Sequence, residues 1–339
     1  MEKRIDVFAV GALNVDLIIH GDAPRDMEEL TQWVGLSRVE LCPAGSVGYC
    51  AIALARLGLK VYMFSTVADD LFGKWIVQSL KEEGIDTKGI NFEKDTLSGI
   101  GIYLLLFGSK KRPLTGRLAT NRPWLKKIPA VVEKQLKSAR ALHCGGYLHY
   151  PQMWGAATEQ LFKKAKQYGL LTSIDSQFPL QEVQKPWIKH FGNLPEYLDL
   201  LLTDELESEM ISGEKNPEHS ARMLIETGIK MVAIKMGQKG ALLASGNEYV
   251  HQPAFKVEGM VDSIGAGDAF DAGVIYGALK GWHLKKIAEF ASAVAAHTLK
   301  GIGGTQTAPR LSEVMQLLKA CKINKKGKHF FRRQNEADT

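Results

Sequence analysis

Apolar and polar residues alternate along the chain in blocks that are typical of an α/β protein. The short apolar runs VYMFSTV (61–67) and LLTSIDS (170–176) predict buried strands. The first run precedes LFGKWIVQSLKEEG (71–84), in which apolar residues recur at helical spacing and a glycine ends the pattern. Strands that alternate with helices usually form parallel sheets. We therefore predict an α/β fold with a mostly parallel central sheet covered by helices on both faces.

The same alternation continues toward the carboxyl end of the chain. In such sheets, ligands bind beyond the carboxyl ends of the strands, so the residues that follow strands are candidates for a functional site. We expect further strands at 141–146, 198–204 and 231–237, helices near 154–168, 205–213 and 217–227, and a loop at 214–219.

Two segments, about 12–40 and 98–119, break this alternation. Each contains strand-like runs with turns, LIIHGD in the first and GIGIYLLLFG in the second, and we expect no helix between the strands. The two segments are predicted to pair as a small separate β-sheet, a lid over the main domain's site. Residues 1–320 would then form one domain with this lid, followed by a tail at 321–339.

The net charge of +6 is concentrated at the carboxyl end of the 339-residue chain. Residues 322–339 contain six lysines and arginines and two acidic residues, so they hold +4 of the charge and leave +2 for the rest. We predict that this tail is disordered and solvated, with weak contact to nucleic acid or to an acidic surface as the alternative. No nucleic-acid partner is expected for the body of the protein.

Cysteine usage and hydropathy favour a cytoplasmic protein. The four cysteines form no C-x-x-C pair and no cluster with histidine, which argues against disulfides and structural zinc. The first residues, MEKR, lead directly into the strand-like IDVFAV, so no signal peptide is expected. No apolar run reaches the roughly 18 residues of a membrane span, so we expect no membrane partner.

The stretch VDSIGAGDAFDAG (261–273) is the strongest candidate for chemistry. Gly265, Ala266 and Gly267 allow a tight turn at the start of an apolar helix, where backbone N–H groups without helical partners attract an anion. Phosphoryl transfer needs such donors together with a carboxylate that accepts a proton. We therefore predict that this turn holds a transferring phosphoryl group and that Asp268 is the base. The alternative is that Asp268 only complements the helix dipole.

Three stretches together resemble a known family, the ribokinase-like (phosphofructokinase-B type) carbohydrate kinases. VDSIGAGDAFDAG is similar to the family's carboxyl-terminal signature D-T-x-G-A-G-D. PAGSVGYCAIALARLG (43–58) and VADDLFGKWIVQSLKEEGIDT (67–87) are similar to its two amino-terminal motifs. The motifs occur in the family's order, and the likeness extends over about residues 4–320. It implies an α/β sheet with a small β lid, in agreement with the hydrophobic pattern.

The resemblance implies specific roles around the phosphate. Asp268 would activate a substrate hydroxyl, and the turn from Gly265 to Gly267 would form the hole for the transferring phosphoryl group. Asp262 and the carbonyl of Ile264 match positions that bind a monovalent cation in many members of the family. This correspondence makes K⁺ an expected cation.

The resemblance also implies residues for magnesium, the sugar and the nucleotide. Asp204 and Glu207, in DELE, are similar to an N-x-x-E motif tied to magnesium and phosphate, although they could simply be a charged first helical turn. Asp16 matches an acid that holds sugar hydroxyls, with a solvated strand acid as the alternative. Gly45 falls in the sugar-contacting turn, and Gly237 falls in the turn on the nucleotide side.

Several positions depart from the family pattern. Tyr49 stands where the family has a sugar-binding Asn, and it either contacts the substrate or packs within its helix. Lys235 stands on the nucleotide side where Thr is usual, and it either neutralises a phosphate or points into solvent. Ala44 replaces one glycine of the sugar-side turn. The catalytic end thus matches the family, whereas the sugar end is altered and leaves the substrate unnamed.

These observations predict an ATP-dependent kinase that phosphorylates a hydroxyl of a sugar or sugar-like small molecule and uses Mg²⁺. The alternatives are a nucleoside kinase of the same family, in which Tyr49 would stack on a base, and a non-catalytic metabolite-binding protein on this fold. The complete amide turn with Asp268 argues against the binding protein, which would have no need for a base. A homodimer formed through the lid is a further expectation.

Overall fold

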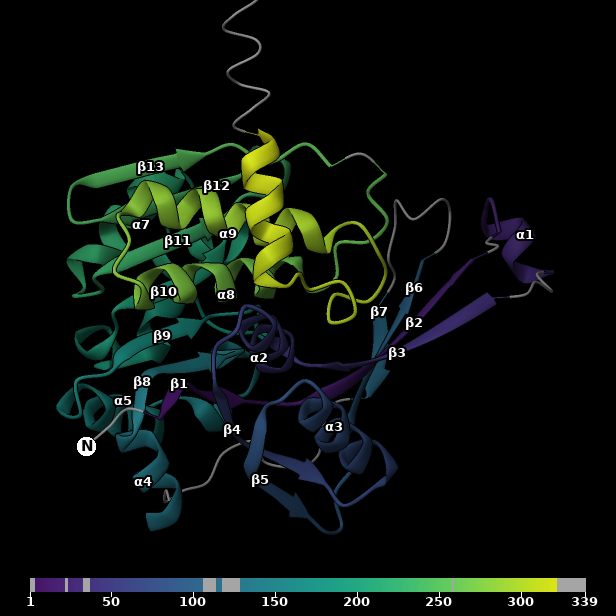
Figure 1. Cartoon of the computed structure of the whole chain (residues 1–339), viewed down its shortest axis with the longest axis horizontal. Coiled ribbons are helices and arrows are strands. Elements are labelled where there is room, and N and C mark those ends of the chain that lie inside the picture. The colour runs from purple at the N-terminus through teal and green to yellow at the C-terminus, as the bar shows by residue number, and fades with distance from the viewer. Residues whose placement is uncertain are drawn as a thin grey trace, which may run out of the picture.

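The computed structural model describes residues 4–21, 24–32, 37–105, 114–117, 129–257 and 259–321. Within them, a nine-stranded sheet forms the centre of the molecule, and a separate four-stranded sheet projects from one side (Figure 1). The predicted tail, apart from residue 321, lies outside the described residues. The same holds for residues 22–23, 33–36, 106–113 and 118–119 of the predicted lid.

The large sheet is mostly parallel, as predicted. Every neighbouring pair of strands from β11 to β5 is parallel, whereas β12 and β13 add an antiparallel hairpin at one edge. From this edge to the other, the strands are β13 (Glu248–Gln252), β12 (Ala241–Ser245), β11 (Met231–Lys235), β10 (Leu200–Asp204), β9 (Leu171–Asp175), β8 (Ala139–Gly145), β1 (Ile5–Gly11), β4 (Val61–Ala68) and β5 (Asp86–Glu93).

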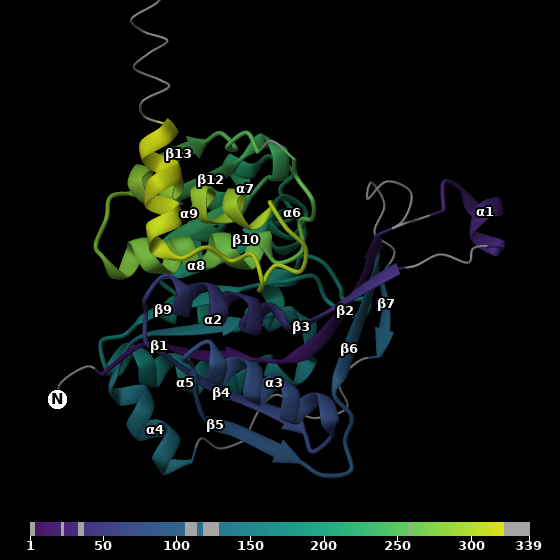
Figure 2. The same ribbon diagram turned by 45° about the vertical axis from the view of Figure 1, so that its right-hand side comes forward.

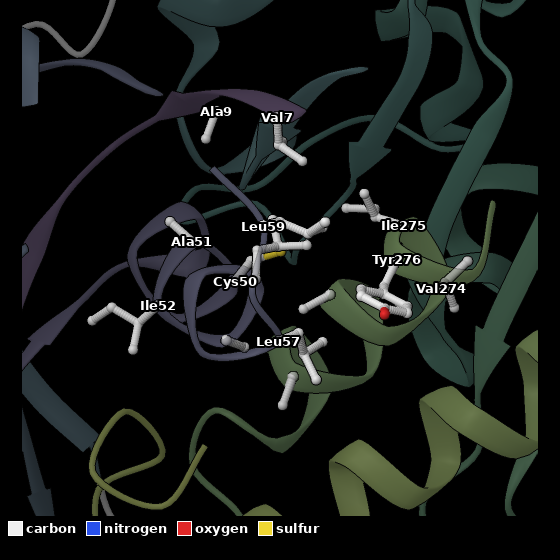
Figure 3. Packing of buried hydrophobic residues seen from close by; sticks show 14 of the residues in the cluster. Val7, Ala9, Cys50, Ala51, Ile52, Leu57, Leu59, Val274, Ile275 and Tyr276 are labelled. Carbon is white, nitrogen blue, oxygen red and sulfur yellow. The ribbon is translucent and has the colours of Figure 1, made fainter. Parts of the chain in front are cut away.

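Helices cover both faces of this sheet because its strands are apolar on both sides. Along β1, Val7 and Ala9 face one hydrophobic cluster, whereas Phe8 and Val10 face the other. Figure 3 shows the first cluster, where residues of β1, α2 and α8 pack together. The first face is covered by α2 (Ser46–Arg56), α3 (Leu71–Glu82), α8 (Ala266–Leu279) and α9 (Leu284–Thr298), and the second by α4 (Ala130–Lys137), α5 (Ala156–Gln167), α6 (Glu205–Ser212) and α7 (Pro217–Glu226).

The small sheet pairs the two segments that broke the alternation. Its strands lie in the order β3 (Ser37–Ala44), β2 (Asn14–Gly21), β6 (Gly99–Leu104) and β7 (Leu114–Arg117). The sheet extends away from the helices of the main body in both views (Figure 2). The prediction of a small separate β-sheet is confirmed.

Two local predictions were wrong. A short helix, α1 (Met27–Thr31), lies between β2 and β3, where no helix was expected, because Asp26 accepts a hydrogen bond from the N–H of Glu29 and caps it. The expected loop at 214–219 ends early, because Asn216 caps α7 and Pro217 occupies its first turn. Both helix starts carry an Asp or Asn cap that the hydrophobic pattern alone does not reveal.

No helix among the described residues is both long enough and apolar enough to cross a membrane.

Candidate active site

The predicted phosphate turn lies at the start of α8. Gly265 caps this helix with a φ of 72°, a left-handed conformation that favours glycine. A Cβ at this position would lie 2.8 Å from Cδ1 of Tyr49, so the approach of the ring also requires glycine. Ala266 donates its N–H to the carbonyl of Ser263 at 3.3 Å. The first turn of a helix still presents N–H groups without helical partners, and here they lie beside Asp268.

Asp268 is a buried carboxyl group with an unpartnered oxygen. It lies in the first turn of α8, and 9% of its surface is exposed. Its Oδ1 atom has no hydrogen-bond partner among the described residues. Burial and repulsion from Asp175 raise the pKa of Asp268 to about 8, against the opposing attraction of Lys235. A carboxyl group with a pKa near neutrality and an unpartnered oxygen is suited to accept a proton.

Lys235 ends β11 and joins the site to two further acids. Its Nζ atom lies 3.1 Å from Oδ1 of Asp175 and 2.9 Å from Oδ2 of Asp271. Carboxylate oxygens of Asp175, Asp268 and Asp271 lie within 4.8 Å of one another. The ammonium group is therefore the cation of a three-carboxylate cluster, and it does not point into solvent.

Asp175 and Asp271 were not predicted as site residues. Asp175 is the last residue of β9, so the position of ligands beyond the carboxyl ends of strands was the signal that could have found it. Asp271 lies three positions after Asp268 on α8, a spacing that puts both side chains on one helix face. Ser46, at the start of α2, donates its hydroxyl to Oδ2 of Asp175 at 2.5 Å.

Asp16 lies on β2 of the small sheet and is 3% exposed, so it is not a solvated strand acid. Its Oδ1 accepts a hydrogen bond from Nδ2 of Asn14 at 2.7 Å, and its Oδ2 accepts one from the hydroxyl of Tyr49 at 2.7 Å. Burial outweighs these two hydrogen bonds and raises the pKa of Asp16 to about 6. The carboxyl group of Asp16 is thus held in place from both sides.

Tyr49 lies between Asp16 and the phosphate turn. It belongs to α2, whose cap is Gly45 with a φ of 88°. The side chain is 7% exposed, its hydroxyl donates to Asp16, and its ring packs against Gly265 and Gly304. Tyr49 is therefore both a packed helix residue and the hydrogen-bond partner of a predicted substrate-binding acid.

Asp262 fastens the segment before the phosphate turn to the loop after α9. Its Oδ1 accepts the N–H of Ile264 at 3.1 Å, and its Oδ2 accepts the N–H of Gly303 at 3.2 Å. The carbonyl of Ile264 faces this same loop, since a Cβ on Gly304 would lie 2.5 Å from its oxygen. The structure thus places the two predicted cation ligands within one tightly packed turn.

Asp204 and Glu207 form a capping box at the start of α6. Oδ1 of Asp204 accepts the N–H of Glu207 at 2.7 Å, and Oε2 of Glu207 accepts the N–H of Asp204 at 3.1 Å. The hydroxyl of Ser176, the residue after β9, donates to the same Oε2 at 2.9 Å. Burial and repulsion from Asp175 raise the pKa of Glu207 to about 7. Gly237, the predicted nucleotide-side residue, begins a short turn just after β11 with a φ of 55°.

The fold and the site together define the class of the protein. A mostly parallel sheet carries a buried acid and a helix-start amide turn near the carboxyl ends of its strands, and a small second sheet brings another buried acid toward them. These are the features of a phosphotransferase with the ribokinase-like fold. A family model described as pfkB family carbohydrate kinase matches residues 4–311. The chain belongs to this family, and the predicted family, fold and enzyme class are confirmed.

Individual relatives cover nearly the whole chain. It is 28% identical over 334 residues to 5-dehydro-2-deoxygluconokinase of Clostridium tetani, which covers 94% of each chain. It is 25% identical over 320 residues to ATP-dependent 6-phosphofructokinase of Thermoanaerobacterium thermosaccharolyticum, which covers 93% of this chain and 94% of the relative. A putative ribokinase II from E. coli, solved in complex with ATP and Mg²⁺, has a TM-score of 0.76 and 23% identity over 93% of this chain and 99% of that chain. This last likeness shows the fold.

Proposed function

We propose that the protein transfers the γ-phosphoryl group of ATP to a hydroxyl group of a sugar or sugar-like molecule, with Asp268 as the base. The observation that carries this proposal is a buried carboxyl in the first turn of α8, one oxygen of which has no hydrogen-bond partner within the described ranges. A binding protein on this fold would have no use for such a group, because an unpaired buried carboxyl costs stability. The solved relative with ATP and Mg²⁺ supports the same co-substrate and cation here.

In the proposed reaction, the substrate hydroxyl lies between Asp268 and the γ-phosphorus. The hydroxyl oxygen forms a bond to phosphorus while the bond from phosphorus to the β–γ bridging oxygen breaks, and ADP leaves. The hydroxyl proton passes to the carboxylate of Asp268. The amides from Gly265 to Gly267 stabilise the negative charge of the transferring group.

Asp204 and Glu207 are proposed to hold magnesium on the nucleotide side, next to Gly237. The capping box uses Oδ1 of Asp204 and Oε2 of Glu207, so each carboxylate keeps a second oxygen for a direct or water-mediated contact. Magnesium prefers such oxygen ligands and keeps several waters. When bound, it would neutralise phosphate charge and orient the group that is transferred.

Asp16, Gly45 and Tyr49 are proposed to form the sugar side of the site. Asp16 can accept hydrogen bonds from substrate hydroxyls in addition to those of Asn14 and Tyr49, because each carboxylate oxygen has two lone pairs. Its position on the small sheet supports the proposed role of that sheet as a lid. The tight packing of the Tyr49 ring gives no support to stacking on a nucleoside base. Dimerisation through the lid and a cytoplasmic location stay predictions.

The test of this proposal is the variant Asp268→Asn. We expect a loss of turnover of about 10²–10⁴-fold, while the fold and ATP binding, measured by circular dichroism and calorimetry, are retained. The assay is ATP consumption with 5-dehydro-2-deoxygluconate, fructose 6-phosphate, pentoses, hexoses and nucleosides, which also identifies the substrate. Asp86→Asn, on the edge strand β5, is the matched control and should keep its turnover. Near-normal turnover in Asp268→Asn would contradict the proposed mechanism.

A further inference from the structure

Lys235 and Asp175 form a buried ion pair next to Asp268. The side chain of Lys235 is 15% exposed and that of Asp175 is 1% exposed, and their charged atoms lie 3.1 Å apart. The lysine also packs beneath the phosphate turn, since a Cβ on Gly267 would lie 3.8 Å from its Nζ atom. Carboxylate oxygens of Asp175 and Asp268 lie within 4.8 Å of each other, so this ion pair borders the base in a region where burial limits screening by water.

Burial shifts the pKa of the other titratable groups that face this cluster toward their neutral forms. Burial, together with the nearby acids, raises the pKa of the Cys50 thiol on α2 well above its ordinary value, so the thiol stays neutral. Burial lowers the pKa of His143 on β8 to about 4, so its ring is neutral as well. Burial raises the pKa of Asp271 well above its ordinary value, repulsion from Asp175 and Asp268 adds to this, and attraction to Lys235 opposes it. Glu207 on α6, whose pKa is raised to about 7, is the remaining acid.

The charges of Lys235 and Asp175 are fixed by their mutual contact. Burial opposes both charges, but attraction to Asp175 and Asp271 holds the pKa of Lys235 well above its ordinary value. Attraction to Lys235 and the hydrogen bond from Ser46 likewise overcome burial and hold the pKa of Asp175 below its ordinary value. The pair thus stays charged over the range in which Asp268 titrates.

We propose that Lys235 and Asp175 are positioning residues that act through Asp268: the ammonium group favours the charged form of this base, and the carboxylate opposes it. For its effect on catalysis, this inference rests on the proposed function of Asp268. Without the ammonium, the base would stay protonated up to a higher pH. Without the carboxylate, the base would be charged over a wider pH range but would attract the proton of the hydroxyl less strongly. Together, the two charges keep Asp268 both partly charged and able to attract the proton of the hydroxyl.

The experiment follows the titration of Asp268 itself. Protein labelled with ¹³C at the aspartate side-chain carboxyl groups is titrated by NMR, and the signal of Asp268 is assigned by its loss in Asp268→Asn. We expect Asp175→Asn to lower the midpoint of this titration by about one pH unit or more, and Lys235→Met to raise it by a similar amount. The double variant should titrate close to the wild-type protein. The label leaves Glu207 silent, so its own protonation is not mistaken for that of the base.

The two single variants differ in which ion pair remains at the site. Asp175→Asn leaves Lys235 paired with Asp271, so this variant tests the inference even if Lys235→Met fails to fold. Lys166→Met is the matched control, because it removes the lysine of another Lys–Asp pair, with Asp199 at 2.6 Å, from the opposite face of the sheet. This control should leave the midpoint of Asp268 unchanged.

The outcomes separate this inference from the proposed function. Opposite shifts of the midpoint, with matching shifts in the acid limb of kcat/KM, support the inference. Absent shifts, or shifts in the same direction, overturn it, as does a loss of activity that is equal at every pH. If Asp268→Asn retains turnover while the midpoints shift in opposite directions, the proposed base is wrong and the inference about the charge of Asp268 stands.

Discussion

Two of the buried carboxyl groups in the site, Asp268 and Asp16, differ in the partners of their oxygens. At the proposed phosphate end, Oδ1 of Asp268 has no partner in the part of the chain that the structure describes, and the residue stands in the first turn of α8. At the sugar end, Asp16 has a protein donor on each oxygen, from Asn14 and Tyr49. Burial raises the pKa of both groups, to about 8 and about 6.

The comparison shows how two buried carboxyl groups can be suited to different tasks, one to bind substrate and the other to accept a proton. A carboxyl group that must hold a substrate in place gains from partners that fix its orientation and favour its charge. A carboxyl group that must take up a proton gains from a raised pKa, to which a neighbouring carboxylate such as Asp175 contributes. Burial raises the pKa of both acids, and repulsion from Asp175, which acts on Asp268 only, distinguishes the two.

The pH dependence of activity is the strongest way to test this comparison. Because Asp268 must be charged to accept a proton, we expect kcat/KM to fall about tenfold for each pH unit below about 8, or about a hundredfold from pH 8 to pH 6. Below about pH 6, protonation of Asp16 should make the fall steeper. In Asp16→Asn the activity should be lower, but the steeper phase should be absent.

A profile that stays level from pH 6 to pH 8 would remove the distinction between the two acids at the level of function. The control is the stability of the protein over the same range, so that unfolding is not counted as loss of activity.

Removing the hydroxyl of Tyr49 should weaken the sugar end alone. Tyr49→Phe keeps the ring against Gly265 but takes a donor from Asp16, so we expect KM for the sugar to change about tenfold and kcat to change little. The measurement is steady-state kinetics at saturating ATP.

Replacing the whole side chain of Tyr49 tests which sugar the site prefers. We expect ribose to be a poor substrate of the unmodified protein and Tyr49→Asn to improve ribose phosphorylation relative to the native substrate, because Asn offers donors and acceptors to sugar hydroxyls. A lower melting temperature with unchanged relative kcat/KM values would show that Tyr49 serves packing only. Efficient ribose turnover by the unmodified protein would contradict the prediction outright.

A monovalent cation should act on the phosphate end alone. With Asp262 and the carbonyl of Ile264 beside the turn, we expect K⁺ to raise kcat severalfold over Na⁺, with little effect on KM for the sugar. In Asp262→Ala this response should disappear. Activity that is constant from no K⁺ to saturating K⁺ would rule out the site.

The smallest expected effect is on the melting temperature of the protein when Asp268 is replaced. The folded-state pKa of Asp268 lies above its unfolded value, so the carboxyl stabilises the fold fully only below about pH 4 and loses this contribution as the pH rises to about 8. Asp268→Asn should therefore melt several degrees above the wild-type protein at pH 8–9, and this advantage should shrink as the pH falls. Melting temperatures across this range check the expectation, and a variant that melts lower at pH 9 would contradict it.

Sequence patterns predicted the features that depend on local order. The strands, the helices on both faces and the turn at Gly265 follow from residues that are close together in the chain. The charged neighbours of Asp268 do not follow in this way, because Asp175 and Lys235 come from separate strands that only the folded sheet brings together. The bond between Tyr49 and Asp16 was missed for the same reason, since α2 and the small sheet meet through tertiary packing.

Helix α2 touches both ends of the site with residues only three positions apart. Ser46 contacts Asp175 behind the base, and Tyr49 contacts the sugar-side acid Asp16. Three residues advance a helix by about 4.5 Å, and a helix resists stretching, so this spacing is rigid. If the proposed roles of Asp16 and Asp268 hold, we expect the fixed length of this helix to decide which hydroxyl of a substrate on Asp16 reaches Asp268, and so which carbon is phosphorylated.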